Sequence, residues 1–334
     1  MERTHPSALR LGRVLVTGAA GFIGSHLAEA VLPCASHVRA LVRYNSRGHA
    51  GWLDGSPRRD SIEVVAGDVR DYHSVSQAVK GCDTVFHLAA LIGIPYSYAN
   101  PVAYLRTNME GTFNVLQAAR EHQVANLIVT STSETYGTAQ YAPMDESHPL
   151  VAQSPYAASK IGADQLALSY HRSFGLPVKV VRPFNTYGPR QSPRAIIPTI
   201  ILQLLAGSAR LRIGNLSPTR DFTYVTDTAN GFMAIAESAE CTGTVTNIGM
   251  NTEVSVGDLV DMISGLMGVA ADVETEGSRV RPNASEVFRL RCDNTKILSL
   301  THWRPENDLL TGLAKTVDWF RQREGYEEAR SYVI

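Results

Sequence analysis

Two side chains with acid–base chemistry lie four residues apart in the segment Tyr156-Ala157-Ala158-Ser159-Lys160. Positions four apart share one face of a helix, so Lys160 can lie beside the Tyr156 hydroxyl. A neighbouring positive charge lowers the pKa of a tyrosine toward neutrality, where the phenol can take and return protons. Tyr156 is therefore the candidate acid/base. The same pair could stand on the surface of any amphipathic helix, so this interpretation needs support from elsewhere in the chain.

A glycine-rich turn near the start of the chain gives that support. A strand-length apolar run, Arg13–Thr17, leads into Gly18–Gly24, and a helical pattern follows over Phe22–Leu32. Glycines at positions 18, 21 and 24 allow a tight turn that brings a helix N-terminus against a pyrophosphate. Strand, glycine turn and helix in this order predict a dinucleotide-binding site.

The elements that must position these residues alternate between strands and helices. Further apolar strands are expected over Val38–Val42, Ile62–Ala66, Thr84–Leu88, Asn126–Thr130 and Val178–Val181. Continuous apolar runs are typical of strands buried on both faces, so helices should cover a parallel sheet through right-handed crossovers. The predicted fold class is α/β, a doubly wound Rossmann parallel sheet with a smaller C-terminal substrate-binding domain.

The second half of the chain has a weaker alternation. Its expected elements are helices near Ile196–Leu205, Val256–Met267 and Asn307–Arg323 and a strand over Asp221–Val225. We predict a dinucleotide-binding domain over residues 10–190, to which 222–250 returns, and a substrate-binding domain over 191–221 and 251–330. The active site is expected in the cleft between them.

Composition limits the function classes. Of 334 residues, 44% are hydrophobic, which excludes a disordered chain, and 31 Lys+Arg against 32 Asp+Glu give a net charge of −1. This balance is not the footprint of a nucleic-acid or polybasic membrane binder, so a small-molecule ligand is expected.

Neither a membrane span nor a metal site is expected. The longest uncharged run, Thr84–Leu105, contains His87 and Pro95 and fits a strand followed by a loop. Met1–Gly12 is expected to be a short disordered lead-in without the apolar core of a signal peptide. The four cysteines lack metal-ligand spacing, and their scarcity favours a reducing cytoplasm.

The glycine spacing GxxGxxG, the YxxxK pair and Thr132 at the end of a strand together resemble the short-chain dehydrogenase/reductase family. Further matches are similar to its extended members that act on nucleotide sugars; they are Gly67–Val69, Phe86–Ala90, Thr107-Asn108, Arg182–Arg190 and Arg220–Val225. The resemblance implies a cofactor site made of Gly18, Gly21, Phe22, Ile23, Gly24, Arg43, Asp68, Val69, Leu88, Ala89, Ala90, Asn108, Tyr156 and Lys160. It also implies substrate contacts from Asn185, Arg190, Arg220 and Arg281, since guanidinium groups suit a diphosphate.

The reaction type depends on Thr132-Ser133-Glu134. Epimerases of this family typically carry small non-acidic residues where this chain has Glu134, and its 4,6-dehydratases typically carry Thr-Asp-Glu. Thr-Ser-Glu resembles the retaining UDP-N-acetylglucosamine 4,6-dehydratases of the legionaminic acid pathway type, as do Arg39–Ser46 and Ile92–Tyr98. The motif is also found in UDP-glucuronate decarboxylases. That alternative, and another nucleotide-sugar epimerase/dehydratase, stay open.

The resemblance implies a mechanism that begins with oxidation at C4. Tyr156 takes the C4 hydroxyl proton while the oxidised nicotinamide takes the C4 hydride, which makes the C5 proton acidic. Glu134 removes that proton, water leaves from C6, and the hydride returns to C6. The hydroxyl of Ser133 is a poor general acid, so either Glu134 serves both proton transfers or a bound water relays the second.

Cofactor identity is less clear than cofactor class. NAD-specific relatives end the second strand in an aspartate that binds the ribose, where this chain has Val42-Arg43. Arg43 could equally meet a 2′-phosphate. The subfamily resemblance favours NAD, with NADP possible, and regeneration in each turnover implies tight binding. A non-catalytic dinucleotide sensor of the same fold would be expected to have lost the Tyr156–Lys160 pair.

A homodimer is expected by resemblance. The helices over Val102–Glu121 and Tyr156–Ser173 correspond to those that form a four-helix bundle between subunits in this family. Four alanines, at positions 157, 158, 163 and 167, would allow close approach, although they could equally serve packing inside one subunit. The expected partners are a nucleotide-sugar substrate and a second copy of the chain.

Overall fold

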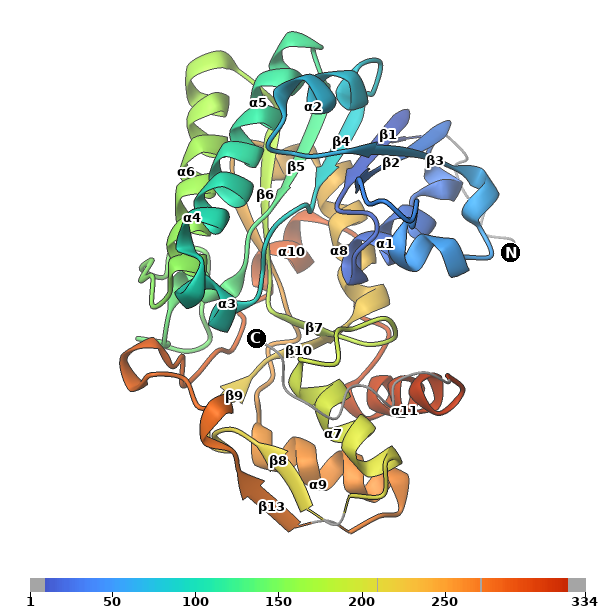
Figure 1. Cartoon of the computed structure of the whole chain (residues 1–334). Coiled ribbons are helices and arrows are strands. Elements are labelled where there is room, and N and C mark those ends of the chain that lie inside the picture. Colours follow the sequence, from blue (N-terminus) through green and yellow to red (C-terminus); the bar gives the residue numbers. More distant parts are fainter. Residues whose placement is uncertain (1–9, 209, 271, 324–334) are drawn as a thin grey trace, which may run out of the picture.

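A seven-stranded parallel sheet forms the centre of the computed structural model, which describes residues 10–208, 210–270 and 272–323 (Figure 1). Its strand order is β11-β6-β5-β4-β1-β2-β3. The strands are β1 (Arg13–Thr17), β2 (His37–Arg43), β3 (Ile62–Gly67), β4 (Thr84–His87), β5 (Asn126–Thr130), β6 (Val178–Pro183) and β11 (Val245–Ile248). The order reverses between β1 and β4, where ligands of such sheets bind. The predicted doubly wound Rossmann fold is confirmed.

Helices cover both faces of this sheet (Figure 1). One face carries α2 (Tyr72–Val79), α5 (Gly111–Glu121) and α6 (Pro155–Phe174), and the other carries α1 (Phe22–Ala30), α8 (Val225–Glu237) and α10 (Thr295–Leu300). Along β1, Val14 and Val16 pack with α1 and α8, whereas Leu15 between them packs with α2 and α5. Every residue of β4 and β6 is buried, as the continuous apolar runs predicted.

A second apolar core lies below the sheet in Figure 1. It contains α7 (Ile196–Leu205), α9 (Val256–Met267), α11 (Leu309–Arg321) and β8 (Arg210–Ile213). The exposed strand β13 (Asp272–Thr275) pairs with β8. The first two helices have the predicted bounds. The third begins two residues later than predicted because the Asp308 carboxylate caps it, accepting a hydrogen bond from the Thr311 amide at 2.8 Å. The two domain boundaries themselves stay a prediction.

Short elements connect the two cores. They are the paired strands β7 (Asn185–Tyr187) with β10 (Phe222–Tyr224) and β9 (Thr219–Arg220) with β12 (Val254–Ser255). The helices α3 (Ile94–Ala99) and α4 (Pro101–Tyr104) pack against α6 instead. In the part of the chain that the structure describes, no helix combines the length and apolarity needed to cross a membrane, and no His, Cys, Asp or Glu group could hold a metal ion.

Three details differ from the sequence predictions. Leu11 is not in a disordered lead-in: it is buried and its amide donates to Cys34 O at 3.2 Å, while residues 1–9 lie outside the described ranges. The helix predicted over 102–121 contains a π-helical segment, Leu105–Glu110. Three of the four alanines proposed for close approach between subunits are buried inside this one, leaving Ala158 exposed.

Candidate active site

The glycine turn at the end of β1 leaves room and donors for a diphosphate. Gly18 has φ +71°, and a Cβ there would lie 2.7 Å from the Ala89 nitrogen; a Cβ at Gly24 would lie 2.3 Å from Gly18 O. The N-cap of α1 is Gly21, which offers no side chain to the first turn. The amides of the first turn of α1 are those of Phe22, Ile23 and Gly24. None of them has a hydrogen-bond partner among the described residues. Free donors at the positive end of a helix fit a pyrophosphate.

Two predicted cofactor residues meet at the ends of β2 and β3. Arg43 is exposed at the end of β2, and its charge reaches Asp68, just after β3. The Asp68 carboxylate accepts from Arg70 Nε at 2.9 Å, and chiefly this hydrogen bond lowers the pKa of Asp68. The next residue, Val69, is buried and packs against the position of Gly111 on α5. This corner therefore presents a carboxylate flanked by two guanidinium groups.

A closed hydrogen-bond chain holds the loop after β4. Thr17 Oγ1 accepts hydrogen bonds from the amides of Leu88, at 3.2 Å, and Ala89, at 3.1 Å. Its own proton is therefore donated to His87 Nδ1 at 2.8 Å. Thr112 Oγ1 donates to a main-chain carbonyl and so accepts from His87 Nε2 at 3.1 Å. His87 is thereby neutral with its proton on Nε2, and burial lowers its pKa to about 3. The chain fixes the partly exposed loop beside the glycine turn.

Asn108 braces the same loop from the π-helical segment. Its Nδ2 donates to Leu91 O at 3.0 Å and Ser159 Oγ at 2.9 Å, and its Oδ1 accepts from the Leu91 amide at 2.8 Å. The side chain is buried and ties the loop to α6. The structure thus gives Asn108 a bracing position, and a direct cofactor contact stays a prediction.

The catalytic turn follows β5. Thr132 caps the 3-10 turn Ser133–Tyr136, and its Oγ1 accepts from the Glu134 amide at 3.2 Å. Ser133 is buried, whereas Glu134 is half-buried. The Thr132 hydroxyl also hydrogen-bonds Tyr156, and the charge of Glu134 acts on the Tyr156 hydroxyl. The structure therefore brings Thr132, Glu134 and Tyr156 together, and their catalytic roles stay a prediction.

The protein's own groups set the pKa of Tyr156 before any cofactor is bound. Burial raises it well above the usual value and the charge of Glu134 adds to this rise, while the Thr132 hydrogen bond opposes it. Lys160 Nζ donates to Thr130 O at 2.6 Å, and burial lowers the Lys160 pKa to about 8. Burial and the charge of Glu134 outweigh the hydrogen bond from Thr132. The expected lowering of the Tyr156 pKa therefore depends on the positive charge that a bound cofactor would bring.

A buried ion pair that the sequence analysis missed lies behind the catalytic helix. Asp164 accepts from Arg182 Nη2 at 2.8 Å and from Ser131 Oγ at 2.7 Å, and both charged side chains are buried. The negative charge of Asp164 raises the Lys160 pKa against the effect of burial. Its position four residues after Lys160, on the same helix face, is the sequence signal that could have revealed it.

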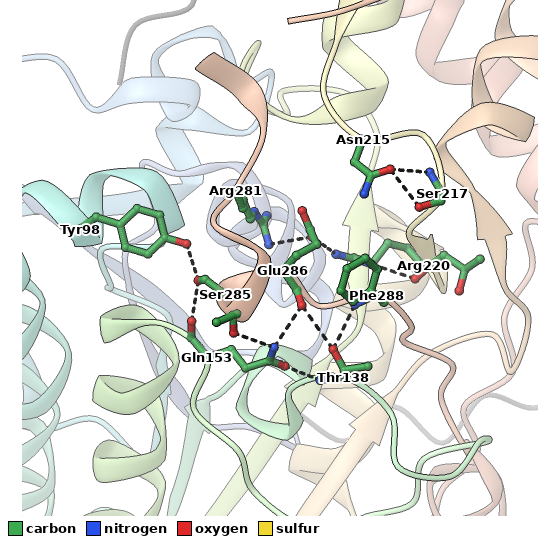
Figure 2. A network of polar contacts seen from close by, with 12 residues as sticks. Tyr98, Thr138, Gln153, Asn215, Ser217, Arg220, Arg281, Ser285, Glu286 and Phe288 are labelled. Atoms are coloured by element: carbon green, nitrogen blue, oxygen red, sulfur yellow. Dashed lines mark hydrogen bonds and ion pairs between the residues drawn. The ribbon is translucent and has the colours of Figure 1, made fainter. Parts of the chain in front are cut away.

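Two predicted substrate residues meet at one carboxylate, Glu286, that the sequence analysis did not place in the site (Figure 2). Arg220 Nη2 lies 3.5 Å and Arg281 Nη1 lies 3.8 Å from Glu286 Oε1. Burial lowers the Arg220 pKa, and the charge of Glu134 is the largest opposing influence. Arg220 therefore connects the catalytic turn with Arg281.

The other two predicted substrate residues have different surroundings. Asn185 opens β7, and its buried Oδ1 has no hydrogen-bond partner among the described residues, which suits a ligand donor. Arg190 instead pairs with Glu29 of α1 at 2.9 Å, and its charge acts on His26 of the same helix. The structure thus places Arg190 beside the helix of the glycine turn and does not bring it to Arg220.

Comparison with known proteins identifies the relatives of this site. A family model described as GDP-mannose 4,6 dehydratase matches residues 15–316. A dTDP-glucose 4,6-dehydratase of Streptomyces antibioticus is 34% identical over 319 residues, 94% of each chain. A UDP-glucose 4-epimerase of Mycolicibacterium smegmatis is 33% identical over 93% of this chain and 99% of its own. The crystal structure of DesIV, a dTDP-glucose 4,6-dehydratase of Streptomyces venezuelae with NAD and TYD bound, has a TM-score of 0.85 and 31% identity over 95% of this chain and 100% of its own.

Proposed function

We propose, because the chain belongs to the GDP-mannose 4,6-dehydratase family, that it is an NAD-dependent nucleotide-sugar 4,6-dehydratase. The observation that carries this proposal is the position of Glu134, whose charge acts on the buried hydroxyl of Tyr156. Elimination next to a carbonyl needs a second proton acceptor beside the tyrosine, and a carboxylate supplies it. Epimerisation at C4 needs no such group.

The residues at the end of β1 fit NAD. The unpaired first-turn amides of α1 would hold its diphosphate, and Asp68 would face its adenosine end. When bound, NAD supplies the acceptor for the C4 hydride and its donor to C6. DesIV holds NAD in its crystal structure, which supports NAD over NADP for this chain despite the exposed Arg43 at the end of β2.

The first proton transfer falls to Tyr156. In its phenolate form Tyr156 takes the proton of the substrate's C4 hydroxyl and becomes a neutral phenol, and the hydrogen bond from Thr132 stabilises the phenolate. Lys160 stays fixed through Thr130 O and presents a positive charge that Asp164 stabilises. The resulting C4 ketone makes the neighbouring C5 proton acidic.

The elimination falls to Glu134. Its carboxylate takes the C5 proton and returns it to the C6 hydroxyl, which leaves as water. When the hydride has returned to C6, C5 takes a new proton that originates from solvent, so solvent deuterium would appear there. Ser133 cannot supply this proton itself, because a serine hydroxyl is a weak acid. Its hydroxyl makes no hydrogen bond to another described residue and remains free to orient the departing water. We therefore assign both proton transfers to Glu134.

UDP-N-acetylglucosamine is the substrate that we propose. The support is the resemblance of Thr132-Ser133-Glu134 to enzymes acting on that sugar. The relatives named dTDP-glucose 4,6-dehydratase make dTDP-glucose the main competing substrate. Both carry a diphosphate, for which Arg220 and Arg281 are the candidate ligands.

Decarboxylation of UDP-glucuronate is the second candidate function. It is favoured by one observation, the charge of Arg220 acting across the site on Glu134. A cation there could face a carboxylate at C5. However, Arg220 already faces two carboxylates, Glu134 and Glu286, so the first proposal is the stronger.

Mass spectrometry of the products tests the proposal. The purified protein is incubated in D₂O with UDP-N-acetylglucosamine, dTDP-glucose or UDP-glucuronate in separate reactions. Loss of water from the first, with deuterium at C5, is expected. Loss of water from dTDP-glucose alone would show that dTDP-glucose, and not UDP-N-acetylglucosamine, is the substrate. Loss of carbon dioxide from UDP-glucuronate would show that the protein is a decarboxylase. A change at C4 without loss of mass would make the chain an epimerase.

A homodimer in the cytoplasm is also part of the proposal. Exposed aromatic side chains on the outer faces of α5 and α6 support the dimer, with Phe113 43% and Phe174 49% exposed. Light scattering coupled to gel filtration should give twice the chain mass. Replacing Phe113 with glutamate should shift the mass toward the monomer.

A further inference from the structure

Gln153 joins three segments of the candidate active site through its side chain (Figure 2). Its Oε1 accepts a hydrogen bond from the Thr138 amide at 2.6 Å. Its Nε2 donates to the carbonyls of Ala284, at 3.2 Å, and Glu286, at 3.0 Å. Both ends of the amide are therefore used, with oxygen toward a donor and nitrogen toward two acceptors.

Each of these segments carries a group that the proposed function needs. Gln153 lies just ahead of α6, three residues before Tyr156. Thr138 lies just beyond the turn that holds Glu134. The third segment contains Glu286, the carboxylate between the two candidate diphosphate ligands. One side chain thus links the proton-transfer groups to the arginines.

Neighbouring contacts strengthen the same junction. Ser285 Oγ donates to Gln153 O at 2.5 Å and accepts from the Tyr98 hydroxyl at 2.5 Å. The Phe288 amide donates to Thr138 Oγ1 at 3.1 Å. The segment around residues 284–288 therefore lies against the catalytic turn, although about 150 residues separate them in the sequence.

The chain leaves room for this amide. Gly137 has φ +66°, and a Cβ built there would lie 2.7 Å from Gln153 Oε1. A side chain at position 137 would push the amide away from Thr138. A carboxylate at position 153 would place an oxygen against the carbonyls of Ala284 and Glu286, where the structure needs a donor.

We propose that Gln153 is a positioning residue that sets the spacing between the arginines for the diphosphate and the proton-transfer groups. This inference rests on the proposed function, because it concerns a substrate that spans both places. The hexose must react at Glu134 and Tyr156 while its diphosphate is held near Arg281. An error of about 1 Å in such an arrangement costs about 100-fold in rate.

Gln153→Glu tests this role against a matched control, Gln203→Glu. Gln203 on α7 makes the same kind of clamp, accepting from the Arg212 amide at 2.8 Å and donating to its carbonyl at 3.1 Å. The control therefore measures what the loss of such a clamp does to stability. Gln153→Met, which has similar length and no charge, is measured beside them in case the glutamate variant does not fold.

Three quantities separate positioning from structure: kcat, KM and the calorimetric Kd for UDP, or for dTDP if the wild type converts that sugar. In NAD-loaded enzyme we expect the Gln153 variants to lose about 10- to 100-fold in kcat. The Kd for the nucleoside diphosphate should stay within about threefold, because each end of the site remains intact. Gln203→Glu should keep kcat within about twofold while its Tm falls comparably.

Two results would overturn the role of Gln153. One is a kcat loss no larger than that of Gln203→Glu. The other is an unchanged kcat with the whole effect in KM and in the Kd for the nucleoside diphosphate, which would make Gln153 a support for the arginines alone. If the wild-type protein converts none of the nucleotide sugars, the proposed function is overturned, and this inference is overturned with it. That result is seen in the wild type alone, before any variant is measured.

Discussion

The cofactor side and the substrate side of the active site are held by different kinds of contact. On the cofactor side, His87 and Asp164 are fully enclosed and bonded to other buried side chains. On the substrate side, Arg220 and Arg281 share one carboxylate at 3.5 and 3.8 Å. The segment around residues 284–288, which carries that carboxylate, reaches Thr138 and Gln153 through bonds between side chains and main chain.

This difference indicates how readily each side of the site tolerates amino-acid substitutions. A buried and closed network tolerates few substitutions, because every lost partner leaves a polar group unpaired in the interior. A segment anchored through its main chain can exchange exposed side chains at little cost. The two relatives of similar identity share glucose in their names but differ in nucleotide and in reaction, one being a dTDP-glucose 4,6-dehydratase and the other a UDP-glucose 4-epimerase.

The largest effect should come from Tyr156→Phe. The phenol is the proton acceptor at C4, so its loss should reduce turnover about 10²- to 10⁴-fold while the buried ring still packs. The matched control is Tyr104→Phe, because the Tyr104 ring packs edge-on against Tyr156 and its hydroxyl donates a hydrogen bond to Gly93 O. Stopped-flow absorbance at 340 nm should show no nicotinamide reduction in the first variant. Normal reduction there would remove Tyr156 from the mechanism.

Glu134→Gln should separate oxidation from elimination. The amide keeps the shape but cannot take the C5 proton, so dehydration should fall about 100-fold or more. Reduced nicotinamide should accumulate on mixing with substrate, since Tyr156 is intact. Absorbance at 340 nm and deuterium at C5 measure the two steps. Full dehydration by this variant would assign the base elsewhere.

The contrast between the two sides also explains what the sequence could predict. Tyr156 and Glu134 could be proposed from the sequence because local spacing and a strand end define their positions. Asp164 was missed because its partner, Arg182, is distant in sequence and only the packed sheet brings them together. The pairing of Arg190 with Glu29 was not predicted because the two residues are far apart in sequence and meet only in the fold. A substrate contact of Arg190 stays a prediction.

The buried ion pair gives the largest expected effect on stability. Asp164→Asn leaves the Arg182 guanidinium buried without its counter-charge, which should cost about 3–5 kcal/mol in the free energy of unfolding. The measurement is urea unfolding of the NAD-loaded protein. A cost below about 1 kcal/mol would mean that the cofactor side is no more tightly determined than the substrate side.

Acid should weaken the cofactor side selectively. Burial lowers the pKa of His26 from its usual 6.5 to about 4. Between pH 6.5 and 4, His26 is therefore protonated in the unfolded chain but neutral in the native protein. Stability is therefore lost as pH falls from 6.5 toward 4. His26→Gln, which can still donate to Pro189 O, should remove about 2–3 kcal/mol of that loss. An identical pH dependence of unfolding in both proteins would contradict this.

The smallest effect should come from a charge pair on the substrate side. Arg289 contacts Glu253 at 2.6 Å, but its side chain is 48% exposed, and Glu253 keeps a second partner in Thr219 Oγ1. Arg289→Gln should therefore cost no more than about 1 kcal/mol in urea unfolding, and less in high salt. A cost near that of Asp164→Asn would show that exposed pairs also determine this side. The distinction between a closed cofactor side and an adjustable substrate side would then fail.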